Sequence, residues 1–337
     1  MKKVIIVSLS GIGNAGGVER VSQYLAEILV NTGYRIKVLE SLKYHFPKFD
    51  YFFQSVIMSL RLFFEKKDLV IANSWQAFLY PCDIVFLHGT MQCYTQKIGK
   101  FKRLSGTGVM ALMEKVAARR AKKVLAVSEH VKKELVELYN INADKIDVLP
   151  NCVDDNCYLP QKSNGSIKKI LFSGRLEYGK GLAYIKALSD YLETIDGWEF
   201  HIASNSRMNE DLFLSNKKTS ISWGLQAEDM PSFYASGDVL FFPSLYEGFS
   251  MSTLEALSSG IPVLGTEYSI TQELADFPFC IDISDIIEEP SKIVPVAEQV
   301  VDEWCDRRIF IHNCISEKFG KKVYTKEFLA KLEGEGL

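Results

Sequence analysis

The sequence predicts an α/β protein built from two doubly wound parallel-sheet domains, and two observations support this. Short β-rich runs alternate with helical patterns along the 337 residues, which is typical of parallel sheets with helices on both faces. The alternation starts again after the polar stretch 159–166, which contains Pro and Gly and is the expected linker. We therefore expect one domain over 1–160, a second over 161–320 and a closing helix over 321–337.

The first domain opens on an apolar run that is interpreted as a buried strand. Lys2 and Lys3 precede it, but the run is too short for a signal peptide or a membrane span. The aromatic stretch from Phe46 to Phe64 has helical spacing and is interpreted as a helix that faces the core. An amphipathic helix is expected over 18–33, and strands over 2–10, 34–41, 68–74, 83–89 and 122–129.

The second domain repeats this organisation. A short helix is expected from about Ser252 to Ser259, and the pattern over 318–334 is that of a closing helix. The strands are expected over 168–174, 198–204, 220–224, 238–244 and 261–266.

Charge is distributed unevenly between the halves. Residues 1–160 carry 22 Lys+Arg against 15 Asp+Glu, a balance of +7, and residues 161–337 carry 17 against 27, a balance of −10, which together give −3. This asymmetry indicates two domains with different partners, while the acidic total argues against nucleic acid. The seven cysteines form no CxxC pair, so reduced thiols in the cytoplasm are expected.

Two carboxylates are the most informative feature of the second half. Seven residues separate Glu247 from Glu255. The expected strand 239–242 precedes Glu247, and the short helix starts between the two carboxylates. Glu247 would lie on a loop at the carboxyl edge of the sheet, and Glu255 one turn into the helix. A helix amino terminus that holds an anion, with carboxylates reaching hydroxyls, suits a sugar nucleotide.

Two cations are expected at the same sheet edge. Arg175 and Lys180 follow a strand and precede a helix, where they can neutralise a diphosphate leaving group together with amides around Ser250 to Ser252. Trp223, Gly224 and Leu225 end another strand and can present backbone to a nucleobase. The chain contains no Asp-x-Asp, so neither a divalent metal nor another cofactor is expected.

A glycine cluster near the amino terminus allows a different interpretation. Residues 11–16 form a literal GxGxxG after a strand, and Glu40 lies where a ribose-binding acid would follow in an NAD-dependent oxidoreductase. The other interpretation is a turn whose exposed amides, at Gly16 and Gly17, face a phosphate or a sugar. The oxidoreductase hypothesis leaves the second half unexplained.

These features together resemble the retaining glycosyltransferases of family 4, which have the two-Rossmann-domain GT-B fold with an inter-domain cleft. The resemblance is carried by GGVER (16–20), LAVSEHVKKEL (125–135), VLPNCVD (148–154), FSGRLEYGKGL (172–182) and PSLYEGFSMSTLEALSSGIPV (243–263), the last with the E-x7-E element. It implies retaining, metal-independent hexosyl transfer to a saccharide or lipid-linked acceptor in bacterial lipopolysaccharide or capsule synthesis. A UDP-sugar is favoured over GDP-mannose as donor, and the closing helix would pack on the first domain.

The resemblance also assigns roles to residues. Glu255 would bind the ribose and Glu247 the transferred sugar, Arg175 and Lys180 would hold the diphosphate, and His88 would touch the sugar or acceptor. The catalytic set is then Glu247, His88, Arg175 and Lys180. The donor-binding set is Gly16, Gly17, Arg175, Lys180, Leu225, Glu247, Gly248, Phe249, Ser250, Met251, Ser252 and Glu255.

Two departures from the family pattern concern loop shape and sugar specificity. Cys152 replaces a usual glycine, and Tyr268-Ser269-Ile270 stands where a glycine pair often precedes the acid matched here by Glu273. A nucleotide-sugar epimerase and a non-catalytic binding subunit of the same fold remain alternatives. Product analysis with and without acceptor separates the first of these from transfer.

A basic run suggests how the protein meets its acceptor. Residues 97–123 hold nine Lys and Arg and a single acid, Glu114. Lys97, Lys100, Lys102 and Arg103 would attract an anionic membrane or a lipid-diphosphate acceptor on the inner face of the plasma membrane. A solvated helix face is the alternative.

Overall fold

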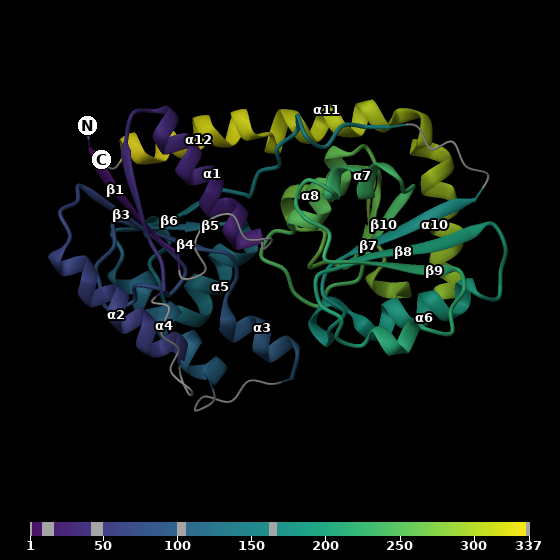
Figure 1. The fold of residues 1–337 in the computed structure, drawn as a ribbon, viewed down its shortest axis with the longest axis horizontal. Helices are drawn as coiled ribbons and strands as arrows, with labels where there is room; N and C mark the ends of the chain where they lie inside the picture. Colours follow the sequence, from purple (N-terminus) through teal and green to yellow (C-terminus); the bar gives the residue numbers. More distant parts are fainter. Residues whose placement is uncertain (1, 9–16, 42–49, 100–105, 162–166, 335–337) are drawn as a thin grey trace. The chain divides into compact units, whose positions relative to one another are not determined.

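The computed structural model describes residues 2–8, 17–41, 50–99, 106–161 and 167–334 (Figure 1). It divides into two compact units, Met1–Asn151 with Thr325–Leu337, and Cys152–Tyr324. Residues from Cys152 onward group with the second unit because they contact it. Val153 pairs with Gly320, and the buried Tyr158 lies 6.0 Å from Tyr234 between ring centroids. The unit boundary therefore precedes the stretch expected as a linker.

The first unit is a six-stranded parallel sheet in the order β2-β1-β3-β4-β5-β6. Its strands are β1 (Lys3–Val7), β2 (Arg35–Leu39), β3 (Leu69–Asn73), β4 (Ile84–Leu87), β5 (Lys123–Ala126) and β6 (Ile146–Val148). Its helices are α1 (Gly17–Asn31), α2 (Asp50–Phe64), α3 (Met91–Lys97), α4 (Gly106–Arg120), α5 (Glu129–Tyr139) and the short turn η1 (Ala143–Lys145).

The second unit repeats the architecture in the order β12-β11-β10-β7-β8-β9, again all parallel. Its strands are β7 (Lys168–Ser173), β8 (Trp198–Ser204), β9 (Thr219–Trp223), β10 (Val239–Phe242), β11 (Val263–Gly265) and β12 (Cys280–Asp282). Its helices and turns are η2 (Tyr178–Lys180), α6 (Leu182–Leu192), η3 (Glu210–Phe213), α7 (Met230–Ala235), α8 (Met251–Ser258), α9 (Gln272–Ala275), η4 (Ser284–Ile286), α10 (Pro290–Trp304), η5 (Cys305–Arg307) and α11 (Arg308–Phe319).

The predicted fold class is confirmed, and each predicted strand overlaps an observed one, although β9 begins one residue before its predicted range. The strands β10 and β4 are buried along their whole length, which is why both read as continuous apolar runs. The strands β6 and β12 were not predicted, because only the first residue of each is buried and no continuous apolar run marks them.

The predicted closing helix over 318–334 is present, but it begins three residues later, at Lys321. Helix α11 ends at Phe319, Gly320 is extended, and α12 (Lys321–Gly334) follows. From Thr325 onward α12 belongs to the first unit, where the ring of Phe328 lies 6.1 Å from that of Phe86.

Helix α2 corrects one expectation. The predicted helix is present over Asp50–Phe64, but its aromatic residues do not face the core. The buried side of α2 carries Gln54, Ser55, Met58, Ser59 and Leu62, whereas Tyr51, Phe52, Phe53, Leu60, Phe63 and Phe64 are exposed. The two serines can be buried because their hydroxyls donate to carbonyls of the preceding turn, at 2.8 Å each.

Candidate functional site

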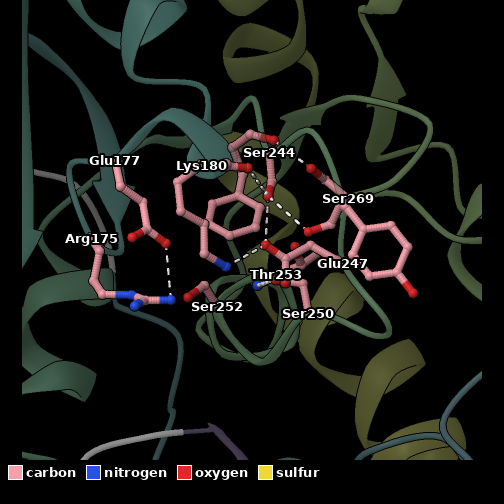
Figure 2. A network of polar contacts seen from close by, with 12 residues as sticks. Arg175, Glu177, Lys180, Ser244, Glu247, Ser250, Ser252, Thr253 and Ser269 are labelled. Carbon is pink, nitrogen blue, oxygen red and sulfur yellow. Dashed lines mark hydrogen bonds and ion pairs between the residues drawn. The ribbon is translucent and has the colours of Figure 1, made fainter. Parts of the chain in front are cut away.

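The site of the second unit is centred on Glu247, in the loop that follows β10. Its Oε1 accepts a hydrogen bond from Lys180 Nζ at 2.5 Å and another from Ser244 Oγ at 2.7 Å (Figure 2). Lys180 ends η2, which follows β7, and β7 pairs with β10. The carboxyl ends of two neighbouring parallel strands therefore bring a cation and a carboxylate into contact, as expected for this edge.

The two loops are locked to each other by their backbones. Leu245 N donates to Gly179 O at 3.0 Å. This hydrogen bond joins the residue just before Lys180 to a residue two positions before Glu247. Gly181 has φ of +79°, and a Cβ there would lie 2.1 Å from Pro243 O. Only glycine allows this approach, because an L side chain is both strained and in collision. These two backbone contacts fix the position of Lys180 relative to the Glu247 loop.

A buried hydroxyl network supports the Glu247 loop from behind. Thr266 Oγ1 donates to Ser244 O at 2.6 Å, and Ser269 Oγ donates to Phe242 O at 2.6 Å (Figure 2). Ser269 is one of the departures from the family pattern, and its side chain holds the last residue of β10. The sequence identified the position as unusual but gave no sign of this contact.

Helix α8 begins at Met251, one residue before the expected start. Ser250 Oγ caps it by accepting from Thr253 N at 3.1 Å (Figure 2). Ser252 Oγ donates to Ser173 O at 3.2 Å. Glu255, in the second turn, is buried. The Phe249 ring is buried against Phe319, with centroids 5.3 Å apart.

Arg175 lies in the same region but is more exposed. Its guanidinium pairs with Glu177 Oε1 at 2.9 Å, and its side chain is 57% exposed. The structure thus brings Arg175, Lys180, Glu247 and Ser252 to adjacent strand ends. Leu225 follows β9, which β8 separates from β7, and it is half-buried.

His88 follows β4 in the first unit and has a definite hydrogen-bond partner. Its Nε2 lies 2.6 Å from Asn73 Oδ1, at the end of the neighbouring strand β3, and Asn73 Nδ2 donates to Ser22 Oγ at 2.5 Å. An acceptor at that distance places the ring proton on Nε2. Burial lowers the pKa of His88 to about 4, so its imidazole is neutral at pH 7.

Glu114 is a buried carboxyl that the sequence did not single out. It accepts from Met91 N at 2.7 Å, from the Tyr139 hydroxyl at 2.8 Å and from Ser74 Oγ at 3.2 Å. Burial raises the pKa of Glu114 to about 7. Glu114 therefore joins the segments that follow β3 and β4, although by sequence it is one acid in a basic run.

The remaining predicted residues of the first unit are less informative. Gly17 begins α1 and Lys97 ends α3, and both are exposed. Gly16, Lys100, Lys102 and Arg103 lie outside the described residues. Among the residues that are described, no three His, Cys, Asp or Glu side chains form a group that could hold a metal ion.

Two family models together match most of the chain, one over each half. The model described as Glycosyltransferase Family 4 matches residues 15–156, and the model described as Glycosyl transferases group 1 matches residues 167–280. Both halves are glycosyltransferase domains. The second match includes Arg175, Lys180, Glu247 and Glu255.

Proteins with sequences similar to these glycosyltransferase domains are themselves named as glycosyltransferases. An uncharacterized glycosyltransferase of Methanocaldococcus jannaschii is 25% identical over 79% of this chain and 74% of its own length. The O-antigen chain mannosyltransferase RfbU of Salmonella typhimurium is 26% identical over 48% of this chain and 46% of its own. The UDP-Gal:alpha-D-GlcNAc-diphosphoundecaprenol alpha-1,3-galactosyltransferase of Escherichia coli is 25% identical over 66% and 61%.

Solved structures show the same GT-B fold. WaaG, a glycosyltransferase involved in lipopolysaccharide biosynthesis, superposes with a TM-score of 0.77 at 16% identity, covering 95% of this chain and 98% of its own. Anabaena HepE, in complex with UDP and glucose, gives 0.71 at 15% identity over 99% and 100%. None of the helices in the described ranges has the length and apolar character to cross a bilayer.

Proposed function

We propose that this protein is a retaining, metal-independent hexosyltransferase that uses a nucleotide diphosphate sugar, with a UDP-sugar favoured over GDP-mannose. The acceptor would be a saccharide or a lipid-linked sugar in bacterial cell-surface polysaccharide synthesis. Support comes from the names of the relatives, which include a UDP-Gal galactosyltransferase acting on a diphosphoundecaprenol substrate and an O-antigen mannosyltransferase. HepE, which shares the fold, has been crystallised with UDP and glucose.

The observation that carries the proposal is the contact of Lys180 with Glu247 at the ends of β7 and β10. Lys180 and Arg175 each have a carboxylate partner, Glu247 and Glu177. A diphosphate carries more charge than either carboxylate and would compete for both cations. Glu247 would then accept from sugar hydroxyls, and the cations would stabilise the charge that develops on the leaving diphosphate.

Helix α8 would supply the rest of the donor site. Because Ser250 already occupies Thr253 N, the amides proposed for a phosphate oxygen are those before it, on Met251 and Ser252. Gly248 and Phe249 would contribute backbone, and Glu255 would bind the ribose hydroxyls. Gly16, Gly17 and Leu225 keep their expected roles as further donor contacts.

His88 would act on the sugar or the acceptor as a neutral hydrogen-bonding group, because burial keeps its pKa well below 7. The absence of an Asp-x-Asp sequence supports transfer without a divalent metal. We place the protein in the cytoplasm, peripheral to the inner face of the plasma membrane, with Lys97, Lys100, Lys102 and Arg103 attracting anionic lipid.

A thermal-shift panel of UDP-, GDP- and ADP-sugars on the wild-type protein and on Glu255→Gln tests the donor site. We expect one nucleotide to raise the Tm of the wild type and to lose that effect in the variant. Binding of a nicotinamide cofactor without any nucleoside diphosphate would refute the proposal. Turnover of the sugar without an acceptor, to a second nucleotide sugar, would instead establish the epimerase.

A further inference from the structure

Helix α2 exposes large apolar side chains on the side where an ordinary surface helix carries polar residues, although Met58 and Leu62 are buried on its inner side. A surface helix normally buries an apolar stripe and exposes polar residues. Here the buried side includes Gln54, Ser55 and Ser59, and the Phe64 side chain is 89% exposed. The outward large side chains are Tyr51, Phe52, Phe53, Leu60, Phe63 and Phe64. We call this outward set the α2 stripe.

The α2 stripe is continuous along the helix and rigidly backed. Phe53, Leu60 and Phe64 are separated by seven and four residues, so they lie on one helix face. Ser59 Oγ accepts from Leu79 N at 3.2 Å, which ties the buried side of α2 to the segment after β3. The ring of Phe63 packs on Tyr80, with centroids 5.0 Å apart. An exposed apolar surface of this kind indicates a partner.

The charges on α2 and on the first unit indicate which kind of surface the α2 stripe contacts. Arg61 is the only charged residue from Tyr51 to Phe64. Beyond the helix, Glu65 is paired with Lys37 at 2.5 Å and with Lys3 at 3.6 Å, whereas Lys66 is exposed. By sequence the first unit carries 24 Lys+Arg against 16 Asp+Glu, a balance of +8, and Cys152–Tyr324 carries 15 against 26, a balance of −11. An apolar stripe on a strongly basic unit matches an anionic bilayer.

We infer that the α2 stripe docks the protein on an anionic phospholipid surface, with its aromatic side chains at the boundary between headgroups and acyl chains. A second copy of the chain fits less well, because pairing two stripes would bring two units of charge +8 together. The inference rests on the proposed transfer to a lipid-linked acceptor for its purpose, but the docking itself involves none of the donor-site residues. Helix α2 lies on the outside of its unit (Figure 1).

Vesicle co-sedimentation tests the inference with a matched pair of triple variants. Leu60→Gln, Phe63→Gln and Phe64→Gln together remove the apolar stripe while keeping good helix formers. Leu214→Gln, Ile309→Gln and Phe310→Gln make the same chemical change at exposed residues of the second unit. The full chain is mixed with vesicles containing phosphatidylglycerol, and with pure phosphatidylcholine vesicles, over a range of salt. Each variant is also tested for a thermal shift with UDP.

We expect the wild type and the control variant to bind the anionic vesicles alike, and the stripe variant to bind about 100-fold more weakly or worse, because three apolar side chains are lost. The UDP shift should survive in both variants, which shows that they fold. No vesicle binding by the wild type at low salt, or equal loss in both variants, would overturn the inference. A wild-type dimer that dissociates in the stripe variant, without vesicle binding, would assign the stripe to a second copy. Vesicle binding without any UDP shift in the wild type would sink the proposed function and leave docking standing.

Discussion

Replacing Gly181 by alanine should separate the two loops of the donor site. A Cβ at this position would lie 2.1 Å from Pro243 O, so the loops must move apart by roughly 1 Å to restore van der Waals contact. The φ of +79° adds about 1–2 kcal/mol of backbone strain. Lys180 is the neighbouring residue, and its 2.5 Å bond to Glu247 cannot survive such a movement unchanged.

Gly197→Ala is the matched control. Gly197 has φ of +85°, but a Cβ there would meet nothing within 4 Å. Both variants should lose about 1–2 kcal/mol of unfolding free energy from strain, measured in urea. Gly181→Ala should lose more because of the collision. Only Gly181→Ala should also lower kcat/KM for transfer, by about 100-fold, since a 1 Å misplacement in an active site has effects of that size.

Equal activity in the two variants would refute the reasoning, because the loop contact would then not position Lys180. The measurement uses the nucleotide sugar that gives the largest thermal shift, so that binding and transfer are compared for one donor.

Three further predictions follow from single side chains. Lys180→Ala should lower kcat/KM by about 100-fold or more while the Tm changes little, since the side chain is partly exposed; near-normal rates would contradict its role at the diphosphate. Glu255→Ala should raise the KM for the donor and weaken UDP binding in calorimetry, and an unchanged affinity would remove Glu255 from the ribose site. Glu114 has its pKa raised from 4.5 to about 7 on folding, so its stabilising effect is present below pH 4.5 and is lost as the pH rises to about 7. The unfolding free energy of Glu114→Gln, measured in urea relative to that of the wild type, should therefore rise by about 3 kcal/mol between pH 4.5 and 8. If the difference in unfolding free energy between the two proteins stays constant with pH, Glu114 does not titrate in this range.

The sequence predicted most of the fold because buried parallel strands are continuous apolar runs. It also predicted that Arg175, Lys180 and Glu247 lie at one edge of the sheet, because the carboxyl ends of parallel strands share that edge. It could not predict which side of α2 faces the core, since helical spacing is the same whichever side is buried. The hydroxyls of Ser55 and Ser59 are satisfied by carbonyls of their own helix, so both residues can be buried, and such bonds leave no periodic signal in the sequence.

The contacts that shape the site were also beyond the sequence. Gly181 meets Pro243 across 62 positions, and Ser269 holds Phe242 across 27. Both contacts depend on how closely β7, β10 and the segment after β11 approach, which is a property of the packed sheet. The burial of Glu114 is similar, because it depends on the ends of β3 and β4 together with α5.

The bond between Lys180 and Glu247 has a consequence for the order of recognition. If Lys180 must change partner before Glu247 can accept a sugar hydroxyl, then the diphosphate of the donor has to bind before the sugar can. UDP alone would bind almost as well as the intact donor, whereas the free monosaccharide would find Glu247 engaged. Selection among sugars would then take place only after the nucleotide has been accepted, which separates the two choices in time.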